Sequence, residues 1–175
     1  MEITVERIKE LRELTSCGVI ECKKALEEAN GDIEKAKEVL KRRGLEIAAK
    51  KEGRTTAEGR IESYVHPGAK IGVLLEANCE TDFVAKMDEF CKFTKDVAMH
   101  VAAMNPEYLK EEDIPEDLLK NVEDKESFVK EKCLLMQPFV RDPKITIQEY
   151  INSLISSIGE NISIKRFVRY KVNES

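Results

Sequence analysis

The side chains best suited to chemistry in this sequence are its thiols and imidazoles. There are five cysteines and two histidines: Cys17, Cys22, Cys79, Cys91, Cys133, His66 and His100. Such groups bind zinc or act as a nucleophile with its base, but both roles need defined spacings. No C-x-x-C pair occurs, and a zinc site would need ligands from distant segments. We therefore expect no metal site, no cofactor and mostly buried thiols in a reducing compartment.

The common catalytic motifs are absent from the sequence. It contains neither of the glycine-rich phosphate loops, no H-E-x-x-H and no G-x-S-x-G. A Cys–His pair would have to join Cys79 or Cys91 to His100. Cys91 and His100 are nine residues apart on one predicted helix, which is not a facing spacing. A thiol-dependent enzyme remains an alternative, and we expect instead a function carried by a binding surface.

Length and charge narrow the class of protein further. The 175 residues suit one domain, or a small module joined to a larger one. The net charge is −5, and the acidic surplus lies in residues 56–175, because residues 1–55 carry +1. This balance disfavours a direct nucleic-acid partner. No apolar run approaches the ~20 residues of a membrane span, and residues 1–6 resemble no signal or transit peptide, so we expect a cytoplasmic protein.

Residues 1–46 are predicted to form a three-helix bundle. Apolar residues recur at helical spacing in 4–15, 19–29 and 33–44. Asp32 suits the N-cap of the third helix, and Gly44 is expected to end it. Residues 47–58 then become polar, and we place a linker there.

In residues 59–175 the apolar period changes from 3.6 to 2. Alternating runs at 61–66 and 71–79 flank Pro67-Gly68, which predicts a β-hairpin. A third strand is predicted over 162–172. Its apolar residues are expected to share one face: Ile162, Ile164, Val168, Tyr170 and Val172.

Helices are predicted between the hairpin and the last strand. Thr81 is the expected N-cap of a long helix from 82 to about 104, and shorter helices follow near 114–119 and around Phe128. After an irregular stretch, Thr146 and Glu149 match a capping box. The expected fold is α+β: an N-terminal three-helix, UBA-like bundle, then a small antiparallel three-stranded sheet packed with helices. Its open sheet edges favour pairing with another chain.

Two stretches of the sequence resemble the elongation factor Ts family. They are Leu11–Asp32, with Cys-Lys-Lys-Ala-Leu at 22–26, and Asn78–Lys86, with Thr-Asp-Phe-Val at 81–84. The resemblance touches most of the chain except about 107–135. It implies a guanine-nucleotide exchange factor that binds elongation factor Tu, both GDP-bound and nucleotide-free. Because the core unit occurs once in this chain, the resemblance also implies a homodimer.

The resemblance assigns a role to the residues after the second predicted strand. It implies that Thr81, Asp82, Phe83 and Val84 contact elongation factor Tu, and that Asp82 and Phe83 disturb the Mg²⁺ side of its nucleotide site. Thr81 and Asp82 are also explained as a helix cap and a first-turn carboxylate. Phe83 is spaced by seven from Phe90, Val97 and Met104, and spacing alone favours a core stripe.

The resemblance implies a second contact in the N-terminal bundle, through Arg12, Val19, Ile20 and Lys23. Val19 and Ile20 replace methionines usual in the family and are as often core residues in small bundles. Arg12 and Lys23 also fit a solvated face. His100 is either an interface residue or a buried histidine with satisfied hydrogen bonds. The remaining alternative is an adaptor module on a dimerisation domain that binds another protein without affecting nucleotide.

Overall fold

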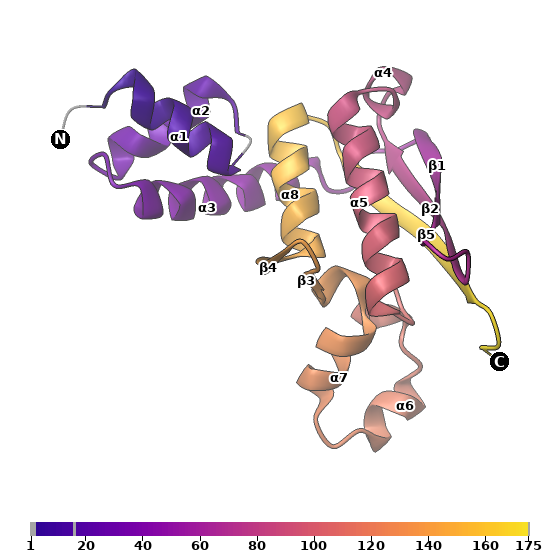
Figure 1. The fold of residues 1–175 in the computed structure, drawn as a ribbon. Helices are drawn as coiled ribbons and strands as arrows, with labels where there is room; N and C mark the ends of the chain where they lie inside the picture. The colour runs from indigo at the N-terminus through magenta and orange to yellow at the C-terminus, as the bar shows by residue number, and fades with distance from the viewer. Residues whose placement is uncertain (1–2, 16, 175) are drawn as a thin grey trace. The chain divides into compact units, whose positions relative to one another are not determined.

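The computed structural model describes residues 3–15 and 17–174, which form helices and two antiparallel sheets (Figure 1). The larger sheet has the strand order β1-β2-β5, and the smaller one pairs β3 with β4. The elements in chain order are α1 (Val5–Thr15), α2 (Val19–Glu28), α3 (Ile33–Lys51), β1 (Glu58–Val65), β2 (Ile71–Cys79), α4 (Asp82–Ala85), α5 (Asp88–Met104), α6 (Glu116–Asn121), α7 (Lys125–Lys132), β3 (Pro138–Phe139), β4 (Asp142–Thr146), α8 (Ile147–Ile158) and β5 (Ile162–Lys171). The predicted α+β class, with three helices and then a three-stranded sheet, is confirmed.

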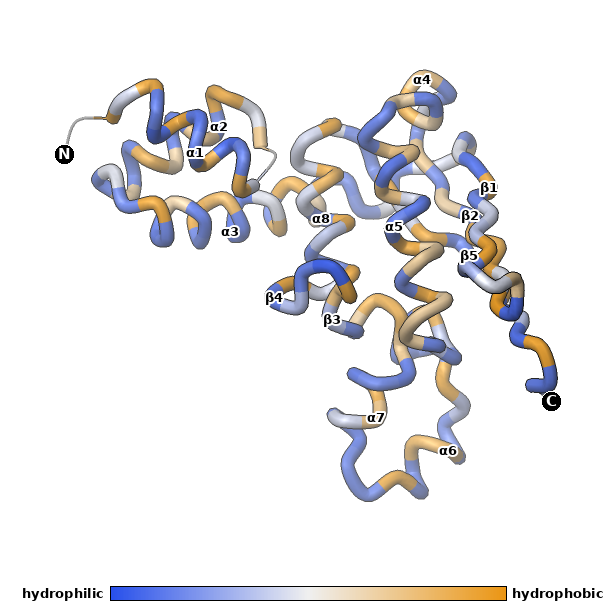
Figure 2. The backbone as a smooth tube through the Cα atoms, viewed as in Figure 1, coloured by the Kyte–Doolittle hydropathy of each residue, from blue (hydrophilic) through white to orange (hydrophobic). Residues whose placement is uncertain are grey.

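The chain divides into two compact units. The first comprises the chain up to Arg54 together with Asn152–Asn161, and the second comprises Thr55–Ile151 and the chain from Ile162 onward. Each unit has its own buried apolar residues, and Figure 2 shows apolar and polar residues alternating along their helices.

In the first unit, α1, α2 and α3 pack around one apolar core. Its buried members are small or aliphatic: Leu11, Cys17, Cys22, Ala25, Leu26, Ala29, Ala36, Val39 and Leu40. The Asp32 side chain accepts a 3.0 Å hydrogen bond from the Lys35 backbone N–H, so it is the predicted N-cap of α3.

The prediction that Gly44 ends the third helix is wrong. Helix α3 continues to Lys51, and Gly44 lies buried within it. A Cβ built at Gly44 would lie 3.9 Å from both the Asn152 carbonyl oxygen and the Ser156 Cβ. The glycine therefore marks a helix–helix contact with α8, while the Ala- and Lys-rich residues after it favour the helix.

In the second unit, the β1–β2 hairpin forms as predicted. Val65 pairs with Gly72, and the His66 backbone N–H donates to the Ile71 carbonyl at 2.9 Å. Helix α5 packs against β1 and β2. It covers the face of β2 that carries the buried residues Val73, Leu75, Ala77 and Cys79.

The third strand exists, but the prediction that its apolar residues share one face is wrong. The register of β5 against β2 shifts between Glu76, which pairs with Arg166, and Ala77, which pairs with Ile164. One extra residue, Lys165, reverses the alternation from there on. Ile162 and Ile164 are thus buried, whereas the later apolar residues Val168, Tyr170 and Val172 are exposed.

The predicted long helix from 82 to 104 is two helices. The short α4 ends at Ala85, and Met87 has the extended backbone of an N-cap before α5. Asp88 and Glu89 then occupy the first turn of α5, where the helix dipole favours carboxylates. Asn105, with φ 48°, ends α5 just before Pro106, as expected.

Residues 106–146 join α5 to α8. Helices α6 and α7 enclose a small cluster of Ile114, Val129 and Cys133. The stretch predicted to be irregular contains the short β3–β4 hairpin instead. The capping box is confirmed in both directions. The Glu149 N–H donates to Thr146 Oγ1 at 3.2 Å, and the Thr146 N–H donates to Glu149 Oε2 at 3.0 Å.

Candidate functional site

The corner between β2 and α4 carries the motif singled out in the sequence. The Cys79 thiol at the end of β2 donates to the Thr81 carbonyl at 3.1 Å. Thr81 is extended, and its Oγ1 accepts from the Val84 N–H at 3.4 Å. The strand therefore passes directly into a capped single turn, which projects Asp82 and Phe83.

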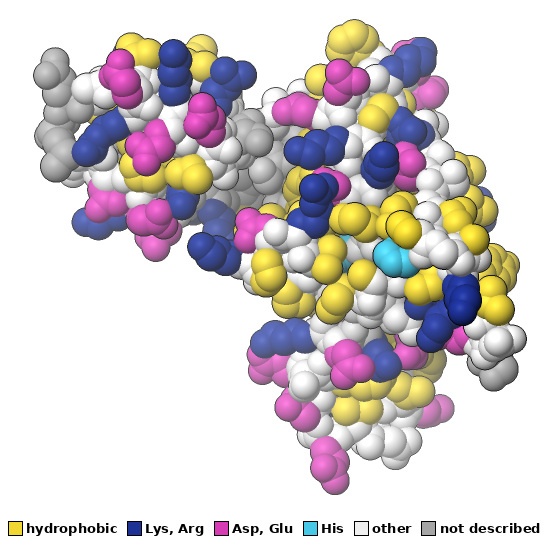
Figure 3. All heavy atoms as spheres, viewed as in Figure 1, with side chains coloured by type: hydrophobic (Ala, Val, Ile, Leu, Met, Phe, Trp, Pro, Cys, Tyr) yellow, Lys and Arg dark blue, Asp and Glu magenta, His cyan; other side chains and the backbone are white. Residues whose placement is uncertain are grey.

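Phe83 is exposed over 73% of its surface, so it is not part of the core stripe that its spacing favours. Phe90 and Val97 of that stripe are fully buried, and the break between α4 and α5 takes Phe83 out of their register. Figure 3 shows apolar side chains at the tip over α4, beside charged ones. An exposed phenylalanine at a tip is a feature of binding surfaces.

The carboxylate of Asp82 is exposed and paired. Lys86 Nζ lies 2.7 Å from Asp82 Oδ2, one helical turn away. This hydrogen bond, followed by the charge of Lys86, lowers the pKa of Asp82. Val84, in contrast, is buried. Of the four predicted contact residues, Thr81, Asp82 and Phe83 lie on the surface and Val84 packs beneath them.

A polar cluster beneath the β2–α4 corner was not predicted from the sequence. The guanidinium of Arg60 in β1 reaches Cys91 Sγ and lies 2.9 Å from Glu62 Oε2. Thr94 Oγ1 also donates to Glu62, at 3.1 Å, and Cys91 Sγ lies 3.9 Å from the carbonyl of Ala85 in α4. The i, i+2 spacing of Arg60 and Glu62 on a strand was the available signal. These contacts tie α4 to β1 and α5.

In the bundle, the four predicted contact residues are all exposed. Val19 and Ile20 form the start of α2, with 51% and 69% of their surface exposed, so the core alternative is wrong for both. Lys23 lies one turn later and is 3.9 Å from Glu27. Arg12 is exposed on α1. The start of α2 thus combines apolar and basic side chains.

His100 is fully buried, and both ring nitrogens are used. Nδ1 accepts the Val140 backbone N–H at 3.1 Å, and Nε2 lies 2.9 Å from Gln137 Oε1, which fixes the neutral Nε2–H form. Burial lowers the pKa of His100. These facts match the buried, satisfied histidine rather than a surface contact. Because both nitrogens of His100 are already hydrogen-bonded, His100 is not free to act as a base for Cys79 or Cys91.

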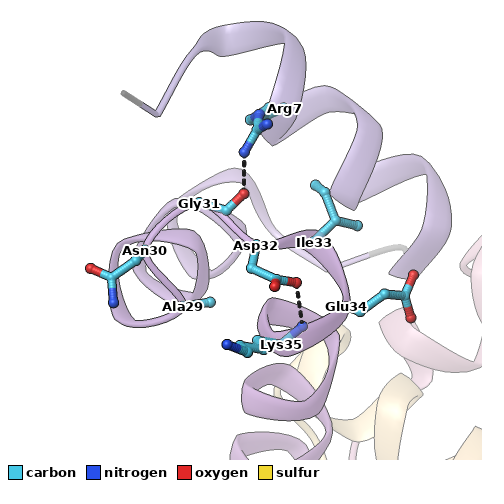
Figure 4. A pocket seen from close by; sticks show the side chains of 8 residues that line it. All are labelled: Arg7, Ala29, Asn30, Gly31, Asp32, Ile33, Glu34 and Lys35. Atoms are coloured by element: carbon cyan, nitrogen blue, oxygen red, sulfur yellow. Dashed lines mark hydrogen bonds between the residues drawn. The ribbon is translucent and has the colours of Figure 1, made fainter. Parts of the chain in front are cut away.

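The turn between α2 and α3 has a shallow hollow of about 460 Å³ (Figure 4). Arg7 donates to the Gly31 carbonyl there, and Asp32 caps α3. These side chains are engaged in local hydrogen bonds that hold the turn, which accounts for them structurally.

Residues 3–15 and 17–174 offer neither a metal-binding cluster nor a membrane-spanning helix. Within those ranges, no three His, Cys, Asp or Glu side chains are grouped in a way that would hold a metal ion. None of the helices described there has an apolar stretch long enough to cross a bilayer.

Known proteins of similar sequence give independent evidence on the family of this chain. The family model for elongation factor Ts matches residues 2–127 and 125–174. The elongation factor Ts of Carboxydothermus hydrogenoformans is 49% identical, over 98% of this chain and 90% of its own length. Those of Alkaliphilus oremlandii (50%; 99% and 91%) and Desulfotalea psychrophila (47%; 98% and 99%) are similar.

The alignments also show a difference in length. The alignment with the Carboxydothermus protein runs over 195 positions, and this chain has 175 residues, so at least 20 positions have no counterpart here. The two family-model matches meet at 125–127, where α7 begins. The identity and coverage leave one conclusion: this chain belongs to the elongation factor Ts family.

Proposed function

We propose that this chain releases GDP from elongation factor Tu by pressing the Asp82–Phe83 corner into the nucleotide domain of that partner. Membership of the elongation factor Ts family makes the chain a nucleotide exchange factor in translation elongation, and not a catalytic enzyme. The proposal adds the residues that act. The observation that carries it is the exposure of Phe83 on a capped turn beside an ionised Asp82.

The physical basis of exchange is competition between two ligands for one partner. GDP is held because phosphates, Mg²⁺ and loop backbone reinforce one another. A factor that favours the state with those contacts broken weakens GDP binding, and GDP weakens the factor by the same ratio. A few kcal/mol of differential contact changes affinities by roughly 100-fold, at ~1.4 kcal/mol per decade. No covalent step, metal or cofactor of the factor itself is needed.

A second contact is proposed at the start of α2, through Arg12, Val19, Ile20 and Lys23. It would hold the factor on elongation factor Tu while the corner acts, because two linked contacts raise the effective concentration of each. Exposed Val19 and Ile20 support this role. For His100 we propose an indirect role: its hydrogen bonds position residues 137–140 from inside the protein.

We further propose a homodimer formed through the outer face of the sheet. Cross-strand pairing puts Ile61, Val65, Leu74, Val168 and Tyr170 on this face, and all five are exposed. Apolar side chains at the surface over the sheet are visible in Figure 3. The edge strand β5 instead carries the exposed Lys165, Arg166 and Lys171, and such charges oppose edge-to-edge pairing.

The proposed functions fall to consecutive segments of the chain. We propose that residues 1–46 act as the partner-binding bundle and 59–175 as the exchange and dimerisation core, joined by residues 47–58, of which 47–51 continue α3 and 58 begins β1. Because the partner acts in translation elongation, we place the protein in the cytoplasm.

The test is stopped-flow release of a fluorescent GDP analogue from elongation factor Tu, run across concentrations of this protein. We expect acceleration that saturates with factor and is lost when excess Mg²⁺ stabilises the GDP complex. Release that stays at its spontaneous rate, while the two proteins still bind, would instead support the adaptor alternative.

A further inference from the structure

We propose that Cys17 and Cys22 form a redox-sensitive dithiol, which an oxidant converts into an intramolecular disulfide that closes a ring around Val19 and Ile20. Both thiols are free and lie in the core of the bundle. The site is defined by helix geometry and does not depend on the identity of any partner.

The position of the two cysteines on α2 brings them together. Gly18 is the N-cap, so Cys17 is the residue before the cap and Cys22 is the fourth residue of the helix. Side chains at these two positions often pack against each other as a hydrophobic staple, and both cysteines belong to one buried cluster here. In this protein both members of the staple are thiols.

The contacts around the pair agree with this arrangement. Cys22 Sγ lies 3.6 Å from the Cys17 carbonyl oxygen. The Thr15 hydroxyl is 3.9 Å from Cys22 Sγ and accepts a hydrogen bond from the Cys17 backbone N–H at 3.4 Å. One hydroxyl therefore contacts both cysteines, and a disulfide requires their Cβ atoms to lie about 3.5–4.5 Å apart with the Cα atoms within about 7 Å.

The start of α2 lacks a feature that usually stabilises the first turn of a helix. Gly18, the N-cap residue, has no side chain that could cap the helix, and among the residues that the structure describes no atom beyond its two chain neighbours lies within 4 Å of where its Cβ would be. An uncapped first turn frays readily. Cys17 sits at the edge, with 9% of its surface exposed, whereas Cys22 is fully enclosed. Burial raises the pKa of both thiols, so fraying and higher pH should each increase the reactive thiolate.

The chemistry is a two-step thiol–disulfide exchange with a small-molecule disulfide such as oxidised glutathione. The Cys17 thiolate attacks one sulfur of the reagent, forms a mixed disulfide and releases one glutathione thiolate. The Cys22 thiolate then attacks the Cys17 sulfur and releases the second glutathione. The protein loses two electrons and two protons, and the reagent gains them as two thiols.

The experiment incubates the folded, full-length chain with oxidised glutathione, alkylates the remaining thiols and maps them by mass spectrometry. We expect two of the five thiols to become protected, a peptide linked through Cys17 and Cys22, and reversal by dithiothreitol. The rate should rise between about pH 7 and about pH 9. Cys91→Ser should leave the link intact, and Cys17→Ser should abolish it.

Three results would overturn the proposal: no internal link in the folded chain, a link that uses Cys79, Cys91 or Cys133, or a link that forms only in denaturant. Because Cys17→Ser could disturb the bundle, its circular dichroism should match that of the parent chain. If it does not, Cys17→Ala serves in its place, since the methyl group keeps an apolar staple.

A second arm asks whether the ring alters the contact of Val19 and Ile20, and this arm rests on the proposed function. We expect oxidation to slow GDP release roughly threefold at subsaturating factor, and the Cys17→Ser protein to be insensitive. Equal rates with a mapped disulfide would contradict the effect on binding alone, because the mass measurement stands by itself.

Discussion

At the scale of single residues, Phe83 is the side chain that most needs an explanation. Burying a phenylalanine stabilises a protein by about 1.5–3 kcal/mol, and this chain forgoes that gain at a position held out by a capped turn. A partner that covers the ring recovers it. The same exposure means that the ring contributes little to folding, which separates its two roles experimentally.

Replacing Phe83 by alanine should therefore lower exchange and spare stability. We expect GDP release to slow at least about tenfold at subsaturating factor. The free energy of unfolding should change by less than about 0.5 kcal/mol, since the side chain is exposed. Stopped-flow release and urea unfolding measure the two quantities. Comparable losses in both would return Phe83 to a structural role.

Phe90 provides the matched control for this prediction. It is the next phenylalanine of the seven-residue series, but it is fully buried. Phe90→Ala should destabilise the protein by about 3–5 kcal/mol. The pair thus tests the same substitution on both sides of the break between α4 and α5.

His100 gives the fold a pH dependence with a defined sign. Its folded pKa is lowered from 6.5 by burial, and the side chains packed on it, Gln137 and Phe139, carry no charge. Below about pH 6.5 the unfolded chain gains a proton that the folded chain does not. The stabilising effect of neutral His100 is thus complete above pH 6.5 and is lost as pH falls toward the folded pKa.

Urea unfolding from about pH 7.5 down to about pH 5 checks this sign. The slope of stability against pH should be smaller in His100→Gln than in the parent chain, by up to about 1.4 kcal/mol per pH unit. Gln cannot titrate, so the comparison isolates the imidazole from the carboxylates. Identical slopes in the two proteins would contradict the assignment of a neutral buried ring.

At the scale of elements, the one-turn helix α4 depends on its cap. The Thr81 Oγ1 bond to the Val84 N–H satisfies one of the few hydrogen bonds available to a four-residue helix. We expect Thr81→Ala to cost about 1 kcal/mol locally and to reduce GDP release severalfold, because Phe83 is no longer held out. Global unfolding should shift much less than exchange does.

Thr81→Ser is the conservative partner of that variant. It retains the hydroxyl oxygen and should keep most of the exchange rate. If serine and alanine proved equally damaging, the methyl group rather than the cap would be what the corner requires.

Most elements could be predicted from the sequence because their signals are local. The hairpin turn at Pro67-Gly68, the Asp32 cap and the Thr146–Glu149 capping box each act within a few residues. The predictions were wrong where contacts with residues distant in the sequence determine the local structure. Gly44 stays helical because α8 packs on it, and β5 changes face at Lys165 because of its pairing with β2.

The candidate site shows the same limit. The Thr81 cap was predictable from residue type, whereas the exposure of Phe83 follows from the helix break at Met87, which no spacing rule indicated. The Arg60–Cys91 contact joins residues 31 apart and could not be found from either neighbourhood.

At the scale of the whole molecule, the proposed dimer should be sensitive to charge on the outer sheet face. Leu74 is exposed at the middle of that face, paired with Val168. We expect Leu74→Glu to shift the sedimentation coefficient from dimer to monomer, because each protomer would bury an unpaired carboxylate in the proposed apolar interface.

Leu118→Glu in α6 is the control, since Leu118 is a similarly exposed leucine outside the sheet. It should leave the oligomeric state unchanged. A parent chain that sediments as a monomer at micromolar concentration, or a Leu74→Glu protein that remains dimeric, would remove the outer face as the interface.

The two family-model matches overlap at residues 125–127, at the start of α7, and the alignment with the Carboxydothermus protein holds at least 20 positions that have no counterpart in this chain. A position at which the family match is broken is a natural candidate for a change in chain length. The start of α7 is therefore a suitable position for inserting a foreign segment. A fluorophore or an affinity tag inserted there would report on assembly of the complex with elongation factor Tu. The residues of the β2–α4 corner and of the N-terminal bundle would remain unchanged.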